Sequence, residues 1–254
     1  MTLLVEAGAS GLQWARLEGS TPGAVGGVVH RGVEPEEWQA PLATLSPAPR
    51  RVVVANTAGA AFGARFGDWS RRQWQVAAEF PVAAREVAEI GVRNGYARPE
   101  TLPIDRWLAL LAAWWRTRAA LVVVGAAGAV SVDLVDDTGR HRGGCVLPGE
   151  RLMREALYAQ TSGIAAAALP DAAAVEGVFG INTAGGVQQG ARLALAAVVD
   201  RAAQALGVAS SAAPRIYMTG AASQELAPLL TRPVERVPHL VLQGLALLVA
   251  GVLR

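Results

Sequence analysis

Residues 93–115 read R-N-G-Y-A-R-P-E-T-L-P-I-D-R-W-L-A-L-L-A-A-W-W, a turn signal and a short polar loop followed by an apolar run. The N-G pair predicts a turn, because both residue types accept a positive φ at little cost. The near-helical spacing of the apolar residues predicts an amphipathic helix that begins near Ile104. Asp105 and Arg106 stand side by side at the head of this helix.

The acid at the head of this helix has a structural explanation. A carboxylate in the first turn is stabilised by the helix dipole, so Asp105 needs no further role to be accounted for. Residue types alone favour this explanation, and they leave a role in a functional site open.

The wider pattern resembles the substrate-binding signature of type III pantothenate kinases. Residues 94–107 match N-G-Y-x-x-P-x-x-L-x-x-D-R-W, and the family usually has a Gly where this chain has Pro103. The resemblance continues on both sides and covers nearly the whole chain. It implies an α/β protein with the actin-like ATPase fold (ASKHA, ribonuclease H-like), duplicated into two domains.

Two hairpins at corresponding places agree with such a duplication. Their strands are expected at residues 2–6, 12–17, 121–124, 129–135 and 141–146. We therefore expect an N-terminal half over residues 1–118, with the first phosphate hairpin and the substrate signature. The C-terminal half is expected over residues 119–254, with the second phosphate hairpin and the dimer-forming helices.

The turns of both hairpins are where the resemblance places ATP and its metal ion. The family opens with D-x-G-N-[ST] and this chain with E-A-G-A-S; an acid there can hold Mg²⁺, and a glycine turn lets backbone N–H groups approach phosphate. An ordinary hairpin ending in Glu is the structural alternative. The second turn departs further, since Gly125, Ala127 and Gly128 replace an acid, a glycine and a threonine. The residues implied at ATP and phosphate are Glu6, Gly8, Ala9, Ser10, Gly128, Ser131, Thr219 and Gly220, and the implied metal ligands are Glu6 and Asp133.

The residues that the resemblance places around the substrate match the family's motif at nearly every position. Asp105 matches the family's catalytic acid, which orients and deprotonates the substrate hydroxyl, and its main value as a weak base is positioning. Arg106 would bind pantothenate through its planar fork. The implied substrate-binding residues are Asn94, Tyr96, Asp105, Arg106 and Thr161. Thr161 has a structural alternative as a helix-end residue that bonds its own backbone.

The function that the resemblance implies is ATP-dependent phosphorylation of pantothenate to 4'-phosphopantothenate, the first step of coenzyme A biosynthesis. The implied cofactors are ATP, Mg²⁺ and a monovalent cation, K⁺ or NH₄⁺, and the implied assembly is a homodimer with interface active sites. Two alternatives stay open: a catalytically silent, Baf-like binding or regulatory relative, and another phosphotransferase with an actin-like fold. The intact Asp105-Arg106 pair favours the enzyme.

Composition narrows the class of protein. The 254 residues are 52% apolar and 17% charged, which argues against disorder. All basic residues are Arg and the formal charge is +2, which gives little support to nucleic-acid binding. One cysteine, Cys145, excludes an internal disulfide and is expected to be a buried small hydrophobe. No signal peptide or membrane-spanning run is expected, so a cytoplasmic protein is predicted.

The remaining stretches give coarser predictions. Loops with one short helix around Trp38 are expected over residues 20–49, and a loop over residues 165–168. A helix through Leu152 and Leu157 is expected to bury one face. His141 is expected to be a surface or loop residue. Further strands are predicted at residues 51–55, 73–78 and 215–218, and further helices at residues 184–206 and 241–252.

Overall fold

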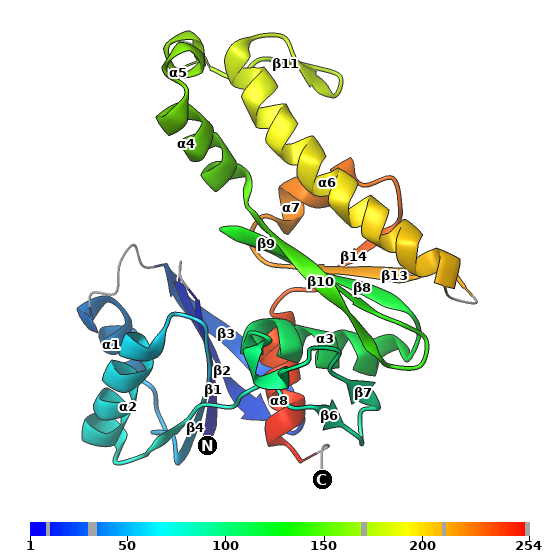
Figure 1. Cartoon of the computed structure of the whole chain (residues 1–254). Helices are drawn as coiled ribbons and strands as arrows, with labels where there is room; N and C mark the ends of the chain where they lie inside the picture. Colours follow the sequence, from blue (N-terminus) through cyan, green and yellow to red (C-terminus); the bar gives the residue numbers. More distant parts are fainter. Residues whose placement is uncertain (9–10, 30–34, 169–171, 210–211, 252–254) are drawn as a thin grey trace. The chain divides into compact units, whose positions relative to one another are not determined.

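The computed structural model of the chain describes residues 1–8, 11–29, 35–168, 172–209 and 212–251. The chain forms two compact units (Figure 1). Unit 1 comprises Met1–Arg118, Thr138–His141 and His239–Arg254, and unit 2 comprises Ala119–Asp137 and Arg142–Pro238. Each unit is built around its own five-stranded sheet.

The sheet of unit 1 has the strand order β3-β2-β1-β4-β5. These strands are β1 (Thr2–Gly8), β2 (Gly11–Glu18), β3 (Thr21–Val29), β4 (Arg51–Asn56) and β5 (Ala78–Glu79). Strand β1 pairs antiparallel with β2 and parallel with β4, so the first hairpin leads into a parallel crossover. Leu3, Leu4 and Val5 have no exposed surface, because helices cover both faces of β1.

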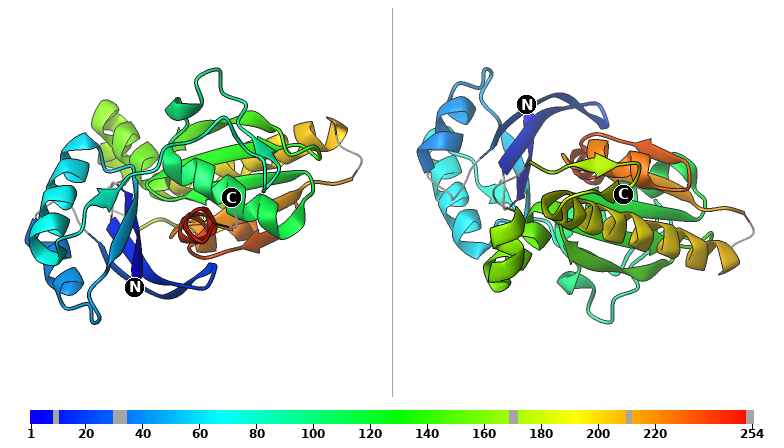
Figure 2. Two further views of the ribbon diagram at one scale, coloured as in Figure 1. Left: turned by 90° about the horizontal axis from the view of Figure 1, so that it is seen from below. Right: turned by 90° about the horizontal axis from the view of Figure 1, so that it is seen from above.

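Four helices flank this sheet: α1 (Pro35–Ala43), α2 (Ala60–Trp74), α3 (Ile104–Thr117) and α8 (Leu240–Val249). Figures 1 and 2 show α1 and α2 on one face and α8 on the other. Aromatic rings pack between α1 and α2. The ring centroid of Trp38 lies 5.3 Å from that of Phe66 and 5.1 Å from that of Trp69. Each such pair adds about 0.5–1.5 kcal/mol beyond the area it buries.

A small substructure of unit 1 precedes α3. Strands β6 (Glu86–Val87) and β7 (Val92–Arg93) pair antiparallel, and the 3-10 turn η1 (Pro99–Thr101) follows. The turn at Thr138–His141 packs on it, with the Arg93 N–H donating to the Gly139 carbonyl at 3.0 Å. Gly139 has φ +82°, and a Cβ there would lie 1.9 Å from the Gly91 carbonyl oxygen, so only glycine fits.

Unit 2 repeats the sheet of unit 1, with the order β10-β9-β8-β13-β14. Its strands are β8 (Leu121–Ala126), β9 (Ala129–Val135), β10 (His141–Pro148), β13 (Arg215–Thr219) and β14 (Val234–Arg236). Strand β8 pairs antiparallel with β9 and parallel with β13, as β1 does with β2 and β4. The predicted duplication is therefore confirmed.

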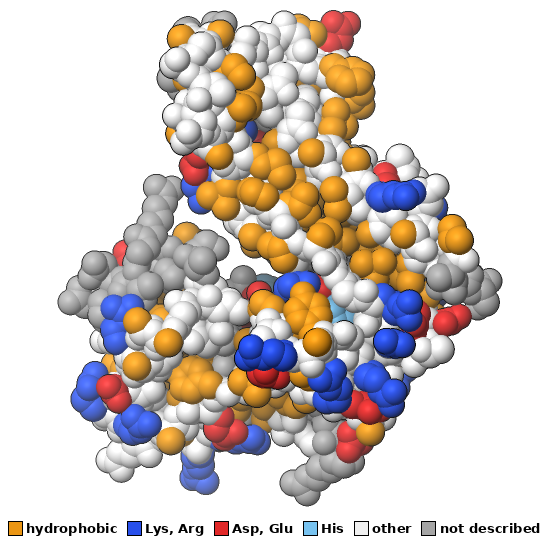
Figure 3. All heavy atoms as spheres, in the orientation of Figure 1, with side chains coloured by type: hydrophobic (Ala, Val, Ile, Leu, Met, Phe, Trp, Pro, Cys, Tyr) orange, Lys and Arg blue, Asp and Glu red, His pale blue; other side chains and the backbone are white. Residues whose placement is uncertain are grey.

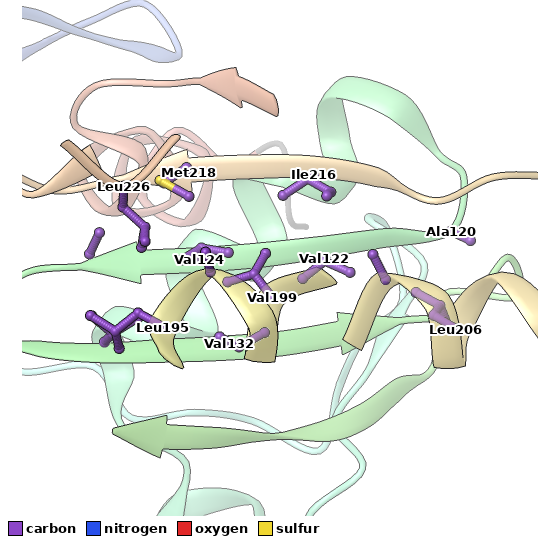
Figure 4. Packing of buried hydrophobic residues seen from close by; sticks show 14 residues of the cluster. Ala120, Val122, Val124, Val132, Leu195, Val199, Leu206, Ile216, Met218 and Leu226 are labelled. Atoms are coloured by element: carbon purple, nitrogen blue, oxygen red, sulfur yellow. The ribbon is translucent and has the colours of Figure 1, made fainter. Parts of the chain in front are cut away.

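Helix α6 (Thr183–Ala209) covers one face of this second sheet. Figure 4 shows Leu195, Val199 and Leu206 of α6 directed at the valines of β8 and β9. The unit also contains α4 (Glu150–Gln160), α5 (Ser162–Ala168), the β11–β12 hairpin (Val175–Glu176 and Phe179–Gly180), α7 (Ser223–Leu226) and the 3-10 turn η2 (Ala227–Leu229).

Several local predictions were wrong. Strand β3 occupies part of the expected loop at residues 20–49, α2 extends to Trp74 where a strand was predicted from residue 73, and α5 replaces the loop at residues 165–168. Helix α4 buries none of its residues, although its spacing predicted one buried face. Cys145 is exposed on β10, which is an edge strand of its sheet, and its neighbours Gly144 and Val146 are exposed as well.

Candidate active site

The head of α3 places the two residues of the signature. Pro103 precedes the helix, which begins at Ile104, and the Asp105 carboxylate accepts the Arg106 N–H at 2.8 Å. Residues 106–114 of this helix are all buried, so its position is set by the core of unit 1. Asp105 is partly exposed and Arg106 only 9% exposed. The core thus fixes a carboxylate and a guanidinium at the start of the helix.

The loop before α3 is organised by Asn94. Its side-chain oxygen accepts the Tyr96 N–H at 3.0 Å, and its side-chain nitrogen donates to the Pro99 carbonyl at 3.2 Å. This arrangement is an Asx turn, in which the amide substitutes for backbone groups. Asn94 is 2% exposed, so the predicted substrate residue is used by its own loop.

Tyr96 joins this loop to the head of α3. Its ring stacks on His141 at 5.6 Å with an interplanar angle of 22°, and the Arg106 guanidinium lies 5.9 Å from its centroid. A cation within about 6 Å of an aromatic face is attracted to it. Asp105, Arg106, Tyr96 and His141 therefore gather in unit 1, with Tyr96 still partly exposed.

His141 was missed by the sequence analysis, which placed it on the surface or in a loop. It is 1% exposed, because the turn at Gly139 carries it against Tyr96. No spacing in the sequence links His141 to Tyr96; only the turn shared by β9 and β10 brings them together.

Glu6 lies toward the end of β1, opposite Gln13 on β2 and Ala55 on β4. Burial raises the pKa of Glu6 to about 7, and the negative charge of Asp105 adds to this shift. The two carboxylates that the resemblance assigned to the metal ion and to catalysis are thus electrostatic neighbours. A cation bound beside Glu6 would favour its ionised form and so oppose the rise in its pKa.

The rest of the first phosphate turn is described only in part, since Ala9 and Ser10 lie outside the described residues. Gly8 pairs with Gly11 across the hairpin. A Cβ at Gly8 would make ordinary contacts, 3.9 Å from both the Gly11 carbonyl oxygen and the Thr57 hydroxyl. The space around Gly8 therefore does not by itself require glycine.

The second turn lies in unit 2, at the carboxyl ends of β8 and β13. Gly125 pairs with Thr219 on one side and Ser131 on the other, and a Cβ at Gly125 would lie 2.8 Å from the Ser131 hydroxyl. Gly220 has φ +97°, and a Cβ there would be 2.2 Å from the Ala126 carbonyl oxygen. Three of the predicted phosphate residues therefore surround Gly125, at the sheet edge where α/β proteins bind ligands.

The other predicted residues of unit 2 lie apart from this turn or at its margin. The carbonyl of Gly128 accepts the Gly149 N–H at 2.9 Å. Asp133 is 2% exposed and lies behind Gly144, where a Cβ would be 2.5 Å from the carboxylate. The Thr161 hydroxyl donates to the Leu157 carbonyl, as its structural alternative predicted.

The described residues hold no cluster of three metal-ligating side chains. Magnesium needs no such cluster, because it is usually held by one or two carboxylates together with phosphate oxygens and water. In the same part of the chain, no helix combines the length and apolarity needed to cross a bilayer.

The sequence profile described as "Type III pantothenate kinase" matches residues 2–205. The chain belongs to the type III pantothenate kinase family. A family member from Nitrosococcus oceani is 33% identical over 97% of this chain and 92% of its own. Another, from Halorhodospira halophila, is 36% identical over 96% of each chain.

Solved structures agree on the fold. A Campylobacter jejuni protein assigned to the Baf family of transcriptional activators superposes with a TM-score of 0.60 at 16% identity, over 96% of this chain and 94% of that one. A Sinorhizobium meliloti protein assigned as a 2-dehydro-3-deoxygalactonokinase gives 0.56 at 11% identity, over 98% of each chain. These likenesses confirm the actin-like fold of this type III pantothenate kinase family member.

Proposed function

We propose that this chain phosphorylates pantothenate to 4'-phosphopantothenate with ATP as donor, the first step of coenzyme A biosynthesis. The observation that carries the proposal is the Asp105-Arg106 pair at the head of α3, beside Tyr96 and His141, in a member of the type III pantothenate kinase family. Phosphoryl transfer needs an aligned hydroxyl, a positioning carboxylate and cations at the phosphates. Unit 1 supplies the positioning carboxylate, Asp105, and one positively charged side chain, Arg106.

Asp105 accepts the hydrogen bond of the substrate hydroxyl and takes its proton as the new bond to the γ-phosphorus forms and the bond to the ADP leaving group breaks. Its position is fixed by α3, so it requires no reorganisation at the moment of reaction. Arg106 provides a planar fork of donors that suits the pantothenate carboxylate. Tyr96 and Thr161 complete the proposed substrate set, with Thr161 contributed across a subunit interface. Asn94 serves this set by shaping the loop that carries Tyr96.

On the ATP side of unit 1, Glu6 would hold Mg²⁺ and backbone groups at Gly8 would approach phosphate. In unit 2, backbone groups at Gly128 would approach phosphate, whereas Asp133, the second ligand that the resemblance implied, is 2% exposed and lies behind Gly144. Ala9, Ser10, Ser131, Thr219 and Gly220 belong to the same proposed set. When bound, Mg²⁺ neutralises charge on the β- and γ-phosphates. Glu6 fits this role because a cation would stabilise its buried carboxylate beside Asp105. A monovalent cation, K⁺ or NH₄⁺, is proposed with this side on the family resemblance.

We further propose a cytoplasmic homodimer formed through α4 and α6. Leu152 and Leu157 of α4 are 38% and 36% exposed, although both are apolar. A hollow of about 340 Å³ lies between the helices, lined by Met153, Leu157, Gly186, Val187, Gly190 and Ala191. Figure 3 shows apolar side chains gathered over these helices. A second copy would cover this surface, and Thr161 directly follows α4.

The test is a coupled assay of ADP release with pantothenate, Mg²⁺-ATP and K⁺. We expect pantothenate-dependent turnover, and a fall in kcat of about 10²-fold or more in Asp105→Asn, which keeps the shape but loses the base. Asp68→Asn is the matched control, because Asp68 pairs with Arg71 on the exposed surface of α2. Unchanged kcat in Asp105→Asn would contradict the assigned role, and a run with Na⁺ in place of K⁺ tests the monovalent cation.

The second candidate is a silent relative that binds pantothenate without turning it over. The observation that favours it is the loss of an acid and a threonine hydroxyl at Gly125 and Gly128 on the phosphate side. If wild-type protein binds pantothenate by calorimetry but releases no ADP, the silent relative replaces the enzyme as the explanation.

A further inference from the structure

Arg85 belongs to none of the family motifs, yet it makes specific contacts with the loop that carries Tyr96. Its Nη1 donates to the Tyr96 carbonyl at 2.6 Å and its Nη2 to the Ala97 carbonyl at 2.7 Å. The Arg85 carbonyl in turn accepts the Asn94 N–H at 2.8 Å. One residue thus holds the loop through three hydrogen bonds, two from the side chain and one from the backbone.

The shape of the guanidinium explains why an arginine suits this position. Two of its nitrogens point in the same direction, so they reach two successive carbonyls at once. A lysine ammonium could occupy only part of this arrangement, because it is a single point of positive charge. A hydrogen bond to a charged donor contributes more than a neutral one, and here two of them act on adjacent peptide groups.

The loop that Arg85 holds carries an aromatic ring with two partners. Tyr96 stacks on His141 and lies beneath the guanidinium of Arg106. The Asx turn of Asn94 shapes the same loop from within. Arg85 contacts the loop from outside it, and Arg85 itself is exposed.

We propose that Arg85 is a positioning residue for substrate binding: it holds Tyr96 in its contacts with His141 and Arg106. This inference rests on the proposed function, since it concerns the binding of pantothenate at that site. Asp105 is held by α3 and its own bond to the Arg106 N–H, which are independent of Arg85. Loss of Arg85 should therefore weaken binding and leave the chemical step nearly intact.

The first experiment compares Arg85→Gln with wild type in the ADP-release assay. We expect KM for pantothenate to rise about tenfold while kcat changes less than about twofold, the pattern of lost binding without lost transition-state contact. Arg85→Lys should recover part of the loss. Arg98→Gln is the matched control, because Arg98 lies in the same loop but bonds only the exposed Glu100 carboxylate by its side chain. Equal KM values in Arg85→Gln and wild type would overturn the proposal.

A double-mutant cycle tests whether Arg85 acts through Tyr96. In a Tyr96→Ala background, Arg85→Gln should raise KM no further, because the ring it positions is already gone. Additive effects of the two substitutions would show that Arg85 has another route to the substrate, and the proposal would fail. A fall in kcat and thermal stability together, with KM unchanged, would show a purely structural role and overturn it too.

Hydrogen exchange separates this inference from the proposed function. Arg85→Gln should speed amide exchange at residues 94–97, whether or not the protein turns over pantothenate. If wild-type protein shows no turnover, the same variants are compared by pantothenate calorimetry, with Kd in place of KM. Wild-type protein that neither turns over nor binds pantothenate would refute the proposed function, and unaltered exchange in Arg85→Gln would refute the positioning.

Discussion

The carboxylates of Glu6 and Asp105 repel each other inside unit 1. This repulsion adds to the effect of burial, and together they raise the pKa of Glu6. The buried group has a pKa of about 7 in the folded protein against an ordinary value of 4.5. The folded protein therefore holds a proton that the unfolded chain releases between those two values. The Glu6 carboxyl is therefore mostly protonated and neutral below pH 7. Above pH 7 it is mostly ionised, and its charge is then unfavourable because of burial and of Asp105.

In the absence of metal ions, the stability of the folded protein should depend on the ionisation of Glu6. Because the folded pKa is raised, the contribution of Glu6 is fully present below pH 4.5 and is lost as pH rises through 7. The difference between the two pKa values corresponds to about 3 kcal/mol in the free energy of unfolding. Glu6→Gln stays neutral, so it should remove this fall and be more stable than wild type at pH 8.

Urea unfolding at pH 5 and pH 8, with EDTA present, measures the effect. Asp68→Asn is again the control, because its exposed carboxylate should leave the slope against pH unchanged. If Glu6→Gln loses as much stability as wild type between these pH values, the ionisation of Glu6 is not the cause.

Sequence alone located the centre of the candidate site but not its surroundings. Asp105, Arg106 and Tyr96 fall within one contiguous pattern, so a signature could find them. His141 and Arg85 could not be found in this way. His141 depends on a turn between two strands of another sheet, and Arg85 bonds only backbone carbonyls, which leave no trace in side-chain patterns.

At the scale of elements, the contact of α3 with α8 sets the position of the signature helix. A Cβ at Gly244 of α8 would lie 2.1 Å from the Leu108 carbonyl oxygen of α3. Gly244→Ala must push the two helices apart, which should cost about 2–3 kcal/mol and lower kcat by displacing Asp105. Thermal unfolding and the ADP-release assay measure both effects.

The control for this prediction is Gly67→Ala on α2 of the same unit. A Cβ there would make an ordinary 3.9 Å contact with Phe80, and alanine is the better helix former. We expect up to about 1 kcal/mol of added stability and unchanged kcat. A Gly244→Ala protein as stable as Gly67→Ala would contradict the close approach of the helices.

The elements that sequence predicted well are short apolar runs and long helices. Strands β1, β4, β8 and β13 are mostly apolar, and α3 and α6 are among the long helices of the chain. Strand β3 was missed because its T-P-G-A-V-G-G-V-V sequence has glycine where a side chain would strike a neighbour. A Cβ at Gly26 would lie 2.7 Å from the Trp14 ring. Tertiary packing, not strand propensity, selects those residues.

At the scale of the whole molecule, the exposed apolar face of α4 leads to a prediction about assembly. Leu157→Asp places a charge in the hollow beside α6, so it should convert a homodimer into monomers and lower turnover with it. Light scattering after size-exclusion chromatography measures the mass. Val208→Asp, at an 86% exposed position near the end of α6, is the control and should remain dimeric. A wild-type monomer would refute the assembly.

Helix α8 packs on α3 and on the sheet of unit 1, yet it follows all of unit 2 in the chain. A ribosome therefore completes the strands of unit 2 before it makes the helix that closes unit 1. During that interval the face of α3 around Leu108 has no cover. A nascent chain of this kind would show apolar surface to chaperones for as long as unit 2 takes to be synthesised.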